Sequence, residues 1–250
     1  MKTLRLYLLG LSLALSMLPA GAAVATVAVA SNFVPTLKAV AALAEQEGTH
    51  QYRIVSGATG GLYAQIRNGA PFDLLLAADS TTPERLQNEG LGVAGSRFTY
   101  ATGQLVLWST QPSLIDAQGA VLQSQRYRTL ALANPKTAPY GAAAVAVLQR
   151  LGVKTPGEQR WVQGESVGQA LSMIATGHAD LGFVALAQLV QAGQLDRGSL
   201  WRVPASLHPP IQQDAILLRR GQDNAAAQAL IRALQSPAGK ALIQSHGYLP

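Results

Sequence analysis

Short apolar runs alternate with segments of helical periodicity along this chain, and this alternation constrains the fold more than any other feature. Apolar runs that predict buried strands lie at residues 26–30, 51–56, 72–78, 130–134, 161–162, 181–186 and 215–218. Segments that predict helices lie at residues 35–46, 140–151, 166–176, 225–234 and 238–245. Thr82 is predicted to cap a further helix that starts at Pro83. Strand, helix, strand is the pattern of an open, mostly parallel sheet flanked by helices, so the sequence predicts an α/β fold.

The alternation restarts after an extended stretch at residues 100–109, which predicts two α/β lobes of similar size. Residues 26–102 and 207–250 are expected to form one lobe, and residues 103–206 a second lobe inserted into it. In such sheets, ligands bind beyond the carboxyl ends of the strands. A ligand shared by two lobes is therefore expected in the cleft between them.

The first 25 residues have the form of a secretory signal peptide. Lys2 and Arg5 precede an apolar run at residues 6–18, and Ala23-Val24-Ala25 has the small residues that a signal peptidase requires. Cleavage is predicted after Ala25, or two residues earlier after Ala23, and export to the periplasm is expected. The chain has no cysteine, so no disulfide can stabilise the exported protein.

Four turns place small polar or glycine residues directly before a predicted helix. They are Ser31-Asn32, Ala58-Thr59-Gly60-Gly61, Pro139-Tyr140-Gly141 and Glu165-Ser166-Val167. None of the four contains Lys, Arg or His, although Lys136 lies in the loop that leads to the third. The N–H groups of a first helical turn, together with hydroxyls, can hold an anion without a charged side chain. The turns therefore indicate an anion site built from neutral donors.

Composition argues against two other classes of ligand. The formal net charge is +6, of which Lys2 and Arg5 supply two, and a positive chain favours encounter with small anions. No basic run with interleaved aromatic residues is present, so a nucleic-acid partner is not expected. The four histidines are scattered and no cysteine accompanies them, so no metal-ion site is expected.

Several segments resemble the periplasmic molybdate-binding proteins of ABC transporters. They are V-A-V-A-S-N-F, S-G-A-T-G-G-L-Y-A-Q-I-R-N-G-A-P-F-D-L-L-L-A-A-D, A-N-P-K-T-A-P-Y-G-A-A-A, E-S-V-G-Q-A-L and A-D-L-G-F-V. The likeness covers nearly all of the mature chain. It implies a type II periplasmic-binding-protein fold that binds molybdate or tungstate between its lobes, without a cofactor. It also implies a monomer that acts with a membrane permease and carries out no enzymatic reaction.

The same resemblance implies which residues meet the anion. Ser31 and Asn32 would bind at the first turn and Thr59 at the second, while Tyr140 and Val167 would bind through their backbones. The sequence departs from one branch of the family, which has a serine in place of Asn32 and a ligand-binding tyrosine in place of Ala185. We expect the amide of Asn32 to replace the donor that is missing at Ala185.

Two alternatives remain open from the sequence. One is a receptor for another tetrahedral oxyanion, sulfate or phosphate. The other is a secreted serine hydrolase, because residues 164–168 match the G-x-S-x-G nucleophile motif around Ser166. Asp180 and either His208 or His246 would complete its triad in the required order. The motif normally follows a strong buried strand, whereas W-V-Q-G is short and polar, so the hydrolase is the less favoured alternative.

Overall fold

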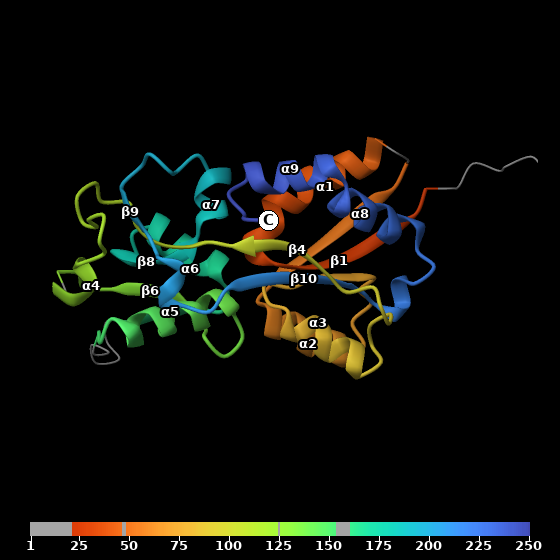
Figure 1. Ribbon diagram of the computed structural model, residues 1–250, viewed down its shortest axis with the longest axis horizontal. Coiled ribbons are helices and arrows are strands. Elements are labelled where there is room, and N and C mark those ends of the chain that lie inside the picture. Colours follow the sequence, from red (N-terminus) through yellow and green to blue (C-terminus); the bar gives the residue numbers. More distant parts are fainter. Residues whose placement is uncertain (1–21, 47–48, 125, 154–160) are drawn as a thin grey trace, which may run out of the picture.

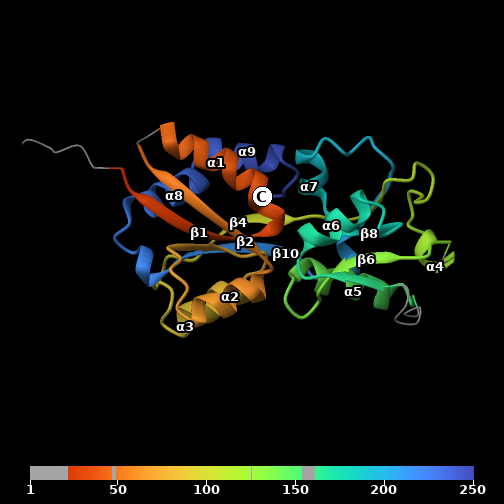
Figure 2. The ribbon, with the colours of Figure 1, turned by 180° about the vertical axis from the view of Figure 1, so that it is seen from behind.

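The computed structural model describes residues 22–46, 49–124, 126–153 and 161–250. Two five-stranded sheets lie side by side along the long axis of the molecule, and helices cover both faces of each sheet (Figure 1; seen from behind in Figure 2). The predicted α/β fold is confirmed. The predicted signal peptide lies almost entirely outside the described residues.

The first sheet has the strand order β2-β1-β3-β10-β4. Its strands are β1 (Val24–Ala30), β2 (Gln51–Gly57), β3 (Leu74–Leu76), β4 (Phe98–Gly103) and β10 (Ile211–Leu217). β1 is an interior strand and pairs in parallel with β2 and β3, whereas β10 is antiparallel to both of its neighbours. We refer to this sheet and its helices as lobe 1.

The second sheet has the strand order β7-β6-β8-β5-β9. Its strands are β5 (Leu105–Ser109), β6 (Leu130–Ala133), β7 (Trp161–Gly164), β8 (Leu181–Ala185) and β9 (Ser199–Arg202). β6 is parallel to β7 and β8, and β5 is antiparallel to both neighbours. Four strands of each sheet therefore share one direction and one runs against them, so the pairing is more mixed than the sequence predicts. We refer to this sheet and its helices as lobe 2.

The reversed strand of each sheet is the one that enters from the other lobe. The chain leaves lobe 1 at the end of β4 and begins β5 after the single residue Gln104. It returns through residues 203–210, which include Pro204 and the pair Pro209-Pro210, and then forms β10. Two covalent connections therefore join the lobes. The extended stretch predicted at residues 100–109 is divided between β4 of lobe 1 and β5 of lobe 2.

Helices connect most of the successive strands. Lobe 1 carries a short 3₁₀ turn, η1 (Ser31–Phe33), followed by α1 (Val34–Gln46), α2 (Thr59–Arg67), α3 (Thr81–Asn88), α8 (Ala225–Gln235) and α9 (Pro237–Ser245). Lobe 2 carries α4 (Val121–Ser124), α5 (Pro139–Arg150), α6 (Val167–Ala175) and α7 (Leu186–Gln191). Within the described ranges, every helix falls short of the length and apolar character that a membrane span needs.

The interior strand β1 is buried on both faces, which explains its unbroken run of small apolar residues. Val27 and Val29 pack in the cluster that contains Leu37 of α1. Ala28, which points to the opposite face, packs with Leu62 of α2 and with Leu75 of β3. Because side chains alternate along a strand, a single short run supports helices on both sides of the sheet. This arrangement fixes where β1 ends and the first turn begins.

Two local predictions need correction or refinement. Thr82 is not the N-cap of α3, because the helix begins at Thr81 and the carboxylate of Asp79 accepts the N–H of Thr82 at 2.8 Å. At the N-terminus, β1 begins at Val24, and Ala25 is buried and in register with Tyr52. Cleavage after Ala23 would keep the whole strand, whereas cleavage after Ala25 would remove its first two residues.

Candidate functional site

Lobe 1 supplies two turns that follow β1 and β2. At the first, Ser31 and Asn32 form η1, and Asn32 is buried. At the second, Ala58 precedes α2, and Thr59 is the first helical residue and is 1% exposed. The hydroxyl oxygen of Thr59 accepts the backbone N–H of Ala78 at 3.0 Å. A hydroxyl that accepts a hydrogen bond still has its own proton to donate, so Thr59 remains a donor for a ligand.

Lobe 2 supplies two turns that follow β6 and β7. Ala138 precedes α5, and Tyr140 is buried in the first turn of that helix. Ser166 precedes α6, and its hydroxyl accepts the N–H of Gln169 at 3.4 Å, which makes it the helix cap. The N–H groups of a first helical turn have no acceptor within their own helix. Tyr140 and Val167 therefore offer backbone donors, whichever side chains they carry.

All five residues that the sequence analysis named line one small cavity between the lobes. In this closed form the cavity has a volume of only about 10 Å³. Its lining is Ala30, Ser31, Asn32, Gly57, Ala58, Thr59, Ala78, Ala138, Pro139, Tyr140 and Val167. No charged side chain is among these lining residues, which matches the prediction of a site built from neutral donors. Ala185, by contrast, is buried in β8 and is not part of this lining.

Direct hydrogen bonds join the lobes around the cavity. The N–H of Gly168 in α6 donates to the hydroxyl of Ser31 at 3.1 Å, and the N–H of Gly60 in α2 donates to the carbonyl of Thr137 at 2.9 Å. The apolar contact is also continuous, since Ala30 and Ala78 of lobe 1 belong to the core cluster of lobe 2. The structure is therefore a closed form, in which both lobes contact each other at the site.

Asn32 lies at the cavity, but its amide N–H groups are used elsewhere. Its Nδ2 donates to Oε1 of Gln213 at 3.0 Å and to the hydroxyl of Tyr248 at 3.1 Å. Its Oδ1 is buried and has no hydrogen-bond partner. The expectation that this amide replaces the donor missing at Ala185 therefore requires a different orientation of the side chain.

A cluster of buried tyrosines surrounds this amide. The hydroxyl of Tyr248 donates to the backbone carbonyl of Asn32 at 2.9 Å. The hydroxyl of Tyr100 lies 2.9 Å from the carbonyl oxygen of Ala77 and 3.0 Å from Oε1 of Gln213. Burial raises the pKa of Tyr100, of Tyr140 and of Tyr248 above the ordinary value for tyrosine. The three hydroxyls therefore stay neutral at physiological pH and add no charge to the site.

A second, larger groove of about 630 Å³ lies beside the cavity. It also runs between the lobes, with the α3 region on one side and α5 on the other. Charged side chains, among them Asp79, Arg85 and Lys136, line this groove and not the cavity. Burial raises the pKa of Asp79. The groove therefore lacks the neutral lining of the cavity.

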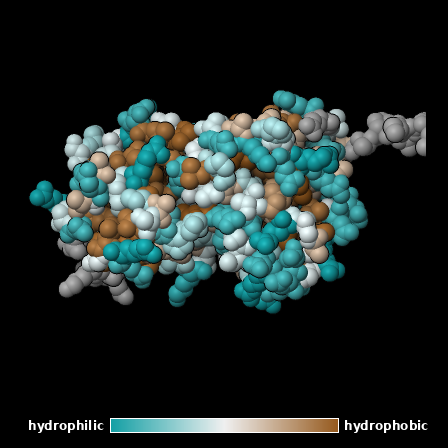
Figure 3. Space-filling model, in the orientation of Figure 1, coloured by the Kyte–Doolittle hydropathy of each residue, from teal (hydrophilic) through white to brown (hydrophobic). Residues whose placement is uncertain are grey.

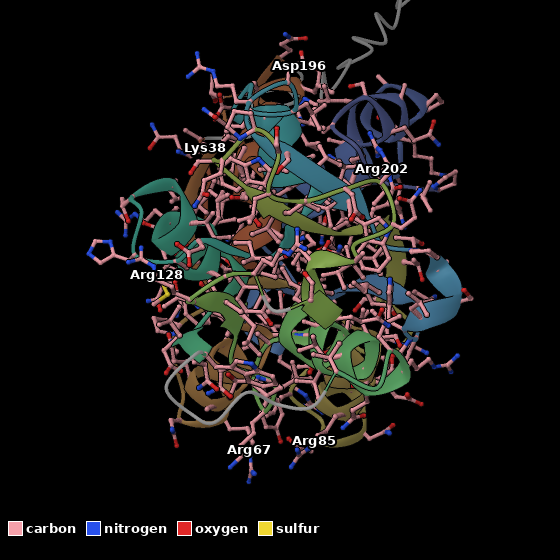
Figure 4. The ribbon with its side chains drawn as sticks, turned by 90° about the vertical axis from the view of Figure 1, so that its left-hand side faces the viewer. Lys38, Arg67, Arg85, Arg128, Asp196 and Arg202 are labelled. Atoms are coloured by element: carbon pink, nitrogen blue, oxygen red, sulfur yellow. The ribbon has the colours of Figure 1, made fainter. Side chains whose placement is uncertain are left out.

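Several arginine side chains extend from the outer surface into solvent. Arg67, Arg85 and Arg128 point outward at the edges of the molecule in Figure 4, and their side chains are 55%, 58% and 91% exposed. On the face drawn in Figure 3, hydrophilic residues break the hydrophobic surface into separate patches. Among the described residues, no three His, Cys, Asp or Glu side chains come together in an arrangement that could hold a metal ion.

The residues of the alternative hydrolase triad are held by other partners. The hydroxyl of Ser166 is the cap of α6, and the carboxylate of Asp180 accepts the N–H groups of Arg128 and Thr129. His208 contacts the carbonyl of the following proline, and His246 contacts a threonine hydroxyl of α1. The geometry therefore gives Ser166 no histidine base.

The comparisons with known proteins agree with this description. A family model described as "Bacterial extracellular solute-binding protein" matches residues 25–249, so the chain belongs to the bacterial extracellular solute-binding proteins. Within this class, the chain is 52% identical to the molybdate-binding protein ModA of Azotobacter vinelandii, over 92% of this chain and 91% of that protein. It is 43% identical to the molybdate-binding protein ModA of Rhodobacter capsulatus, over 99% and 97% of the two chains.

A solved structure supports the same assignment. The structure titled as the periplasmic molybdate-binding protein of Azotobacter vinelandii superimposes with a TM-score of 0.87 and 43% sequence identity. The match covers 90% of this chain and 99% of that one. The predicted two-lobe binding-protein fold is thereby confirmed.

Sequence reasoning missed one buried polar residue that contacts the site residues, Gln213 of β10. Gln213 is fully buried, contacts Asn32 and Tyr100, and donates from Nε2 to the hydroxyl of Tyr140 at 3.2 Å. The strand has a bulge between Gln213 and Asp214, so both of these consecutive residues are buried. The available signal was the pair Gln213-Asp214 directly before the apolar run at residues 215–218. Polar residues that are drawn into a core normally have a partner there, so this pair could have indicated a buried polar contact.

Proposed function

We propose that this protein captures molybdate or tungstate and delivers it to the membrane permease of an ABC transporter. The observation that carries the proposal is the inter-lobe cavity, whose lining combines hydroxyls, an amide and first-turn N–H groups without any charged side chain. The molybdate-binding relatives, at 52% and 43% identity, support the choice of anion. The action is binding and closure, with no bond made or broken and no cofactor required.

The chemistry of the lining suits a tetrahedral dianion. Ser31 and Thr59 each accept a backbone N–H, which leaves the hydroxyl proton to donate to an anion oxygen. The first turns of α5 and α6 add N–H groups at the positive ends of their helix dipoles. Closure excludes water, and hydrogen bonds to a charged acceptor are stronger in the lower dielectric that results.

Selectivity would follow from the size of the cavity and from the absence of a carboxylate in its lining. Sulfate is also a tetrahedral dianion, so only the dimensions of the closed cavity can separate it from molybdate. A protonated phosphate needs a strong acceptor for its own hydrogen, and a lining without a carboxylate does not provide one. The same reasoning does not separate molybdate from tungstate.

We place the protein in the periplasm, as a monomer after removal of the signal peptide. Residues 26–102 and 207–250 would move as one lobe and residues 103–206 as the other, about the connections at Gln104 and residues 203–210. The closed pair of lobes is the form that the permease would meet.

Titration calorimetry of the mature protein with molybdate, tungstate, sulfate and phosphate tests the proposal. We expect molybdate and tungstate to bind tightly and with similar affinity, and sulfate and phosphate to bind far more weakly. Tight binding of sulfate or phosphate in preference to molybdate would replace the proposed ligand. Turnover of a model ester that disappears in Ser166→Ala would instead favour the hydrolase.

A further inference from the structure

The carboxamide of Asn32 presents an acceptor, not a donor, to the cavity. Asn32 lines the cavity, while Gln213 and Tyr248, the partners of its Nδ2, do not. With both contacts of Nδ2 made to residues outside the lining, the end of the amide left for the cavity is Oδ1, which is buried and unpaired. An amide oxygen repels a dianion, and an unpaired buried acceptor is itself unfavourable. This orientation conflicts with anion binding.

Turning the Asn32 amide alone would not resolve the conflict. Its Oδ1 would then face Oε1 of Gln213, and two acceptors would meet at about 3 Å without a proton between them. Rotating both carboxamides by 180° removes this clash, because the two ends of an amide have nearly the same shape. Nε2 of Gln213 then donates to Oδ1 of Asn32, and Nδ2 of Asn32 faces the cavity. The Tyr248 hydroxyl, which accepts from Nδ2 in this structure, would then give its proton to Oδ1 in place of the carbonyl of Asn32, so one of its two bonds to Asn32 is lost.

The tyrosines around Gln213 accommodate this reversed arrangement. After the rotation, the second N–H of Gln213 can donate to the hydroxyl of Tyr100, which keeps its own proton for the carbonyl of Ala77. Oε1 of Gln213 comes to lie where Nε2 now contacts Tyr140, and the Tyr140 hydroxyl can donate to it. Burial keeps these hydroxyls protonated, so each has a proton to give.

We propose that Gln213 is a positioning residue of the anion site, and that an anion turns the carboxamides of Asn32 and Gln213 over together so that Nδ2 of Asn32 faces the cavity. This inference rests on the proposed function, because it concerns the same site. Gln213 lies on β10 of lobe 1, and Tyr140 lies on α5 of lobe 2. The bond between them makes the orientation of the Asn32 amide depend on closure of the lobes.

The backbone around Gln213 holds its side chain in this position. The bulge between Gln213 and Asp214 turns two consecutive side chains inward, and bulges commonly re-aim a side chain next to a binding site. Gly103 lies against the same group, since a Cβ there would overlap the hydroxyl of Tyr140 and come within 2.7 Å of Nε2 of Gln213. The neighbouring Gln212 is exposed and donates to Thr99, so it provides a matched control on the same strand.

A double-mutant cycle with molybdate, measured by titration calorimetry, tests this inference. We expect Gln213→Met to weaken molybdate binding about tenfold, because Asn32 would lose the partner that turns its N–H groups toward the anion. In an Asn32→Ala background, the same change should alter affinity by about twofold or less, since the group that Gln213 positions is absent. Gln212→Met should leave affinity unchanged.

The outcomes separate this inference from the proposed function. Failure of the unmodified protein to bind molybdate would overturn the proposed function and this inference with it. Normal binding by the unmodified protein together with an unchanged affinity of Gln213→Met would overturn this inference alone. An equal loss in both backgrounds would also overturn it, because Gln213 would then act independently of Asn32. If Gln213→Met does not fold, Tyr140→Phe removes the other end of the chain of hydrogen bonds, and the same dependence on Asn32 is expected.

Discussion

Lobe 1 and lobe 2 have the same sheet order but contribute to the site in different ways. The strand orders are β2-β1-β3-β10-β4 and β7-β6-β8-β5-β9, so the reversed strand, β10 or β5, is fourth in each sheet. Two turns of each lobe reach the cavity. The turns of lobe 1 bring polar side chains, Ser31, Asn32 and Thr59. Those of lobe 2 bring Tyr140 and Val167, which we expect to act through their backbone N–H groups, because the Tyr140 hydroxyl is bonded to Gln213 outside the lining. One fold therefore provides two kinds of donor.

This difference has a consequence for specificity. A backbone N–H cannot be removed by changing its side chain, so the contribution of lobe 2 to an anion site is fixed by the fold itself. Hydroxyl and amide donors depend on the residue type, and their protons can be redirected by neighbours such as Gln213. We therefore expect substitutions at the turns of lobe 1 to change affinity more than substitutions at the turns of lobe 2.

The largest effect is expected where the lobes touch. The N–H of Gly60 donates to Thr137, and a Cβ on Gly60 would lie 3.1 Å from the Cα of Thr137. Gly60→Val should hold the lobes apart and weaken molybdate binding by about 1–3 kcal/mol or more, the usual cost of overpacking. Gly61→Val is the matched control, because a Cβ on Gly61 meets nothing within 4 Å. Calorimetry on both variants gives the measurement, and equal affinities would show that closure at Gly60 does not contribute.

An effect of the same order, but no larger, is expected at Thr59. Thr59→Val preserves the shape of the side chain but removes a donor to the anion, which should weaken molybdate binding by about 1–3 kcal/mol. The same change leaves the buried N–H of Ala78 unpaired, so the free energy of unfolding without ligand should also fall. Thr59→Ser keeps the hydroxyl and should preserve most of the affinity for molybdate and most of the free energy of unfolding. Calorimetry and chemical denaturation measure them, and an unchanged affinity in Thr59→Val would remove Thr59 from the site.

The sequence predicts most of the strands and helices and the four turns, because each depends on a local pattern, but it misses β9 and α4. A helix start after a buried strand is visible in a few residues, as at Thr59. The reversed direction of β5 and β10 is not visible locally, since it depends on which lobe the chain comes from. Gln213 escaped prediction for a related reason: its partner Asn32 lies 181 residues away, and a bulge places it inside. The cavity brings the five predicted residues together, and their contact with an anion stays a prediction.

In lobe 2, Ser166→Ala should affect stability and leave affinity nearly unchanged. The hydroxyl of Ser166 accepts the N–H of Gln169 as the cap of α6, so its loss should cost about 0.5–2 kcal/mol of unfolding free energy. The N–H of Val167, the expected donor to the anion, is unaffected by the substitution. Affinity for molybdate, measured by calorimetry, should therefore stay within about twofold. A tenfold loss would mean that the serine hydroxyl itself binds the anion and that lobe 2 also contributes side chains.

The smallest effect is expected from pH, because neither lobe places a charged side chain in the cavity. Burial raises the pKa of Tyr100, Tyr140 and Tyr248 above its ordinary value of 10, so these hydroxyls stay protonated up to pH 9. Burial lowers the pKa of His246 below 6.5, so this imidazole stays neutral above that pH. Affinity for molybdate should therefore be nearly flat between about pH 6.5 and 9, and calorimetry at two ionic strengths should show only a weak salt dependence. An affinity that rises as the pH falls would show that an acidic group close to the anion takes up a proton, and Asp79 of the neighbouring groove, whose pKa burial raises, would be the first to test. A steep salt dependence would show that a charged group contacts the anion, and either result would contradict a site of neutral donors.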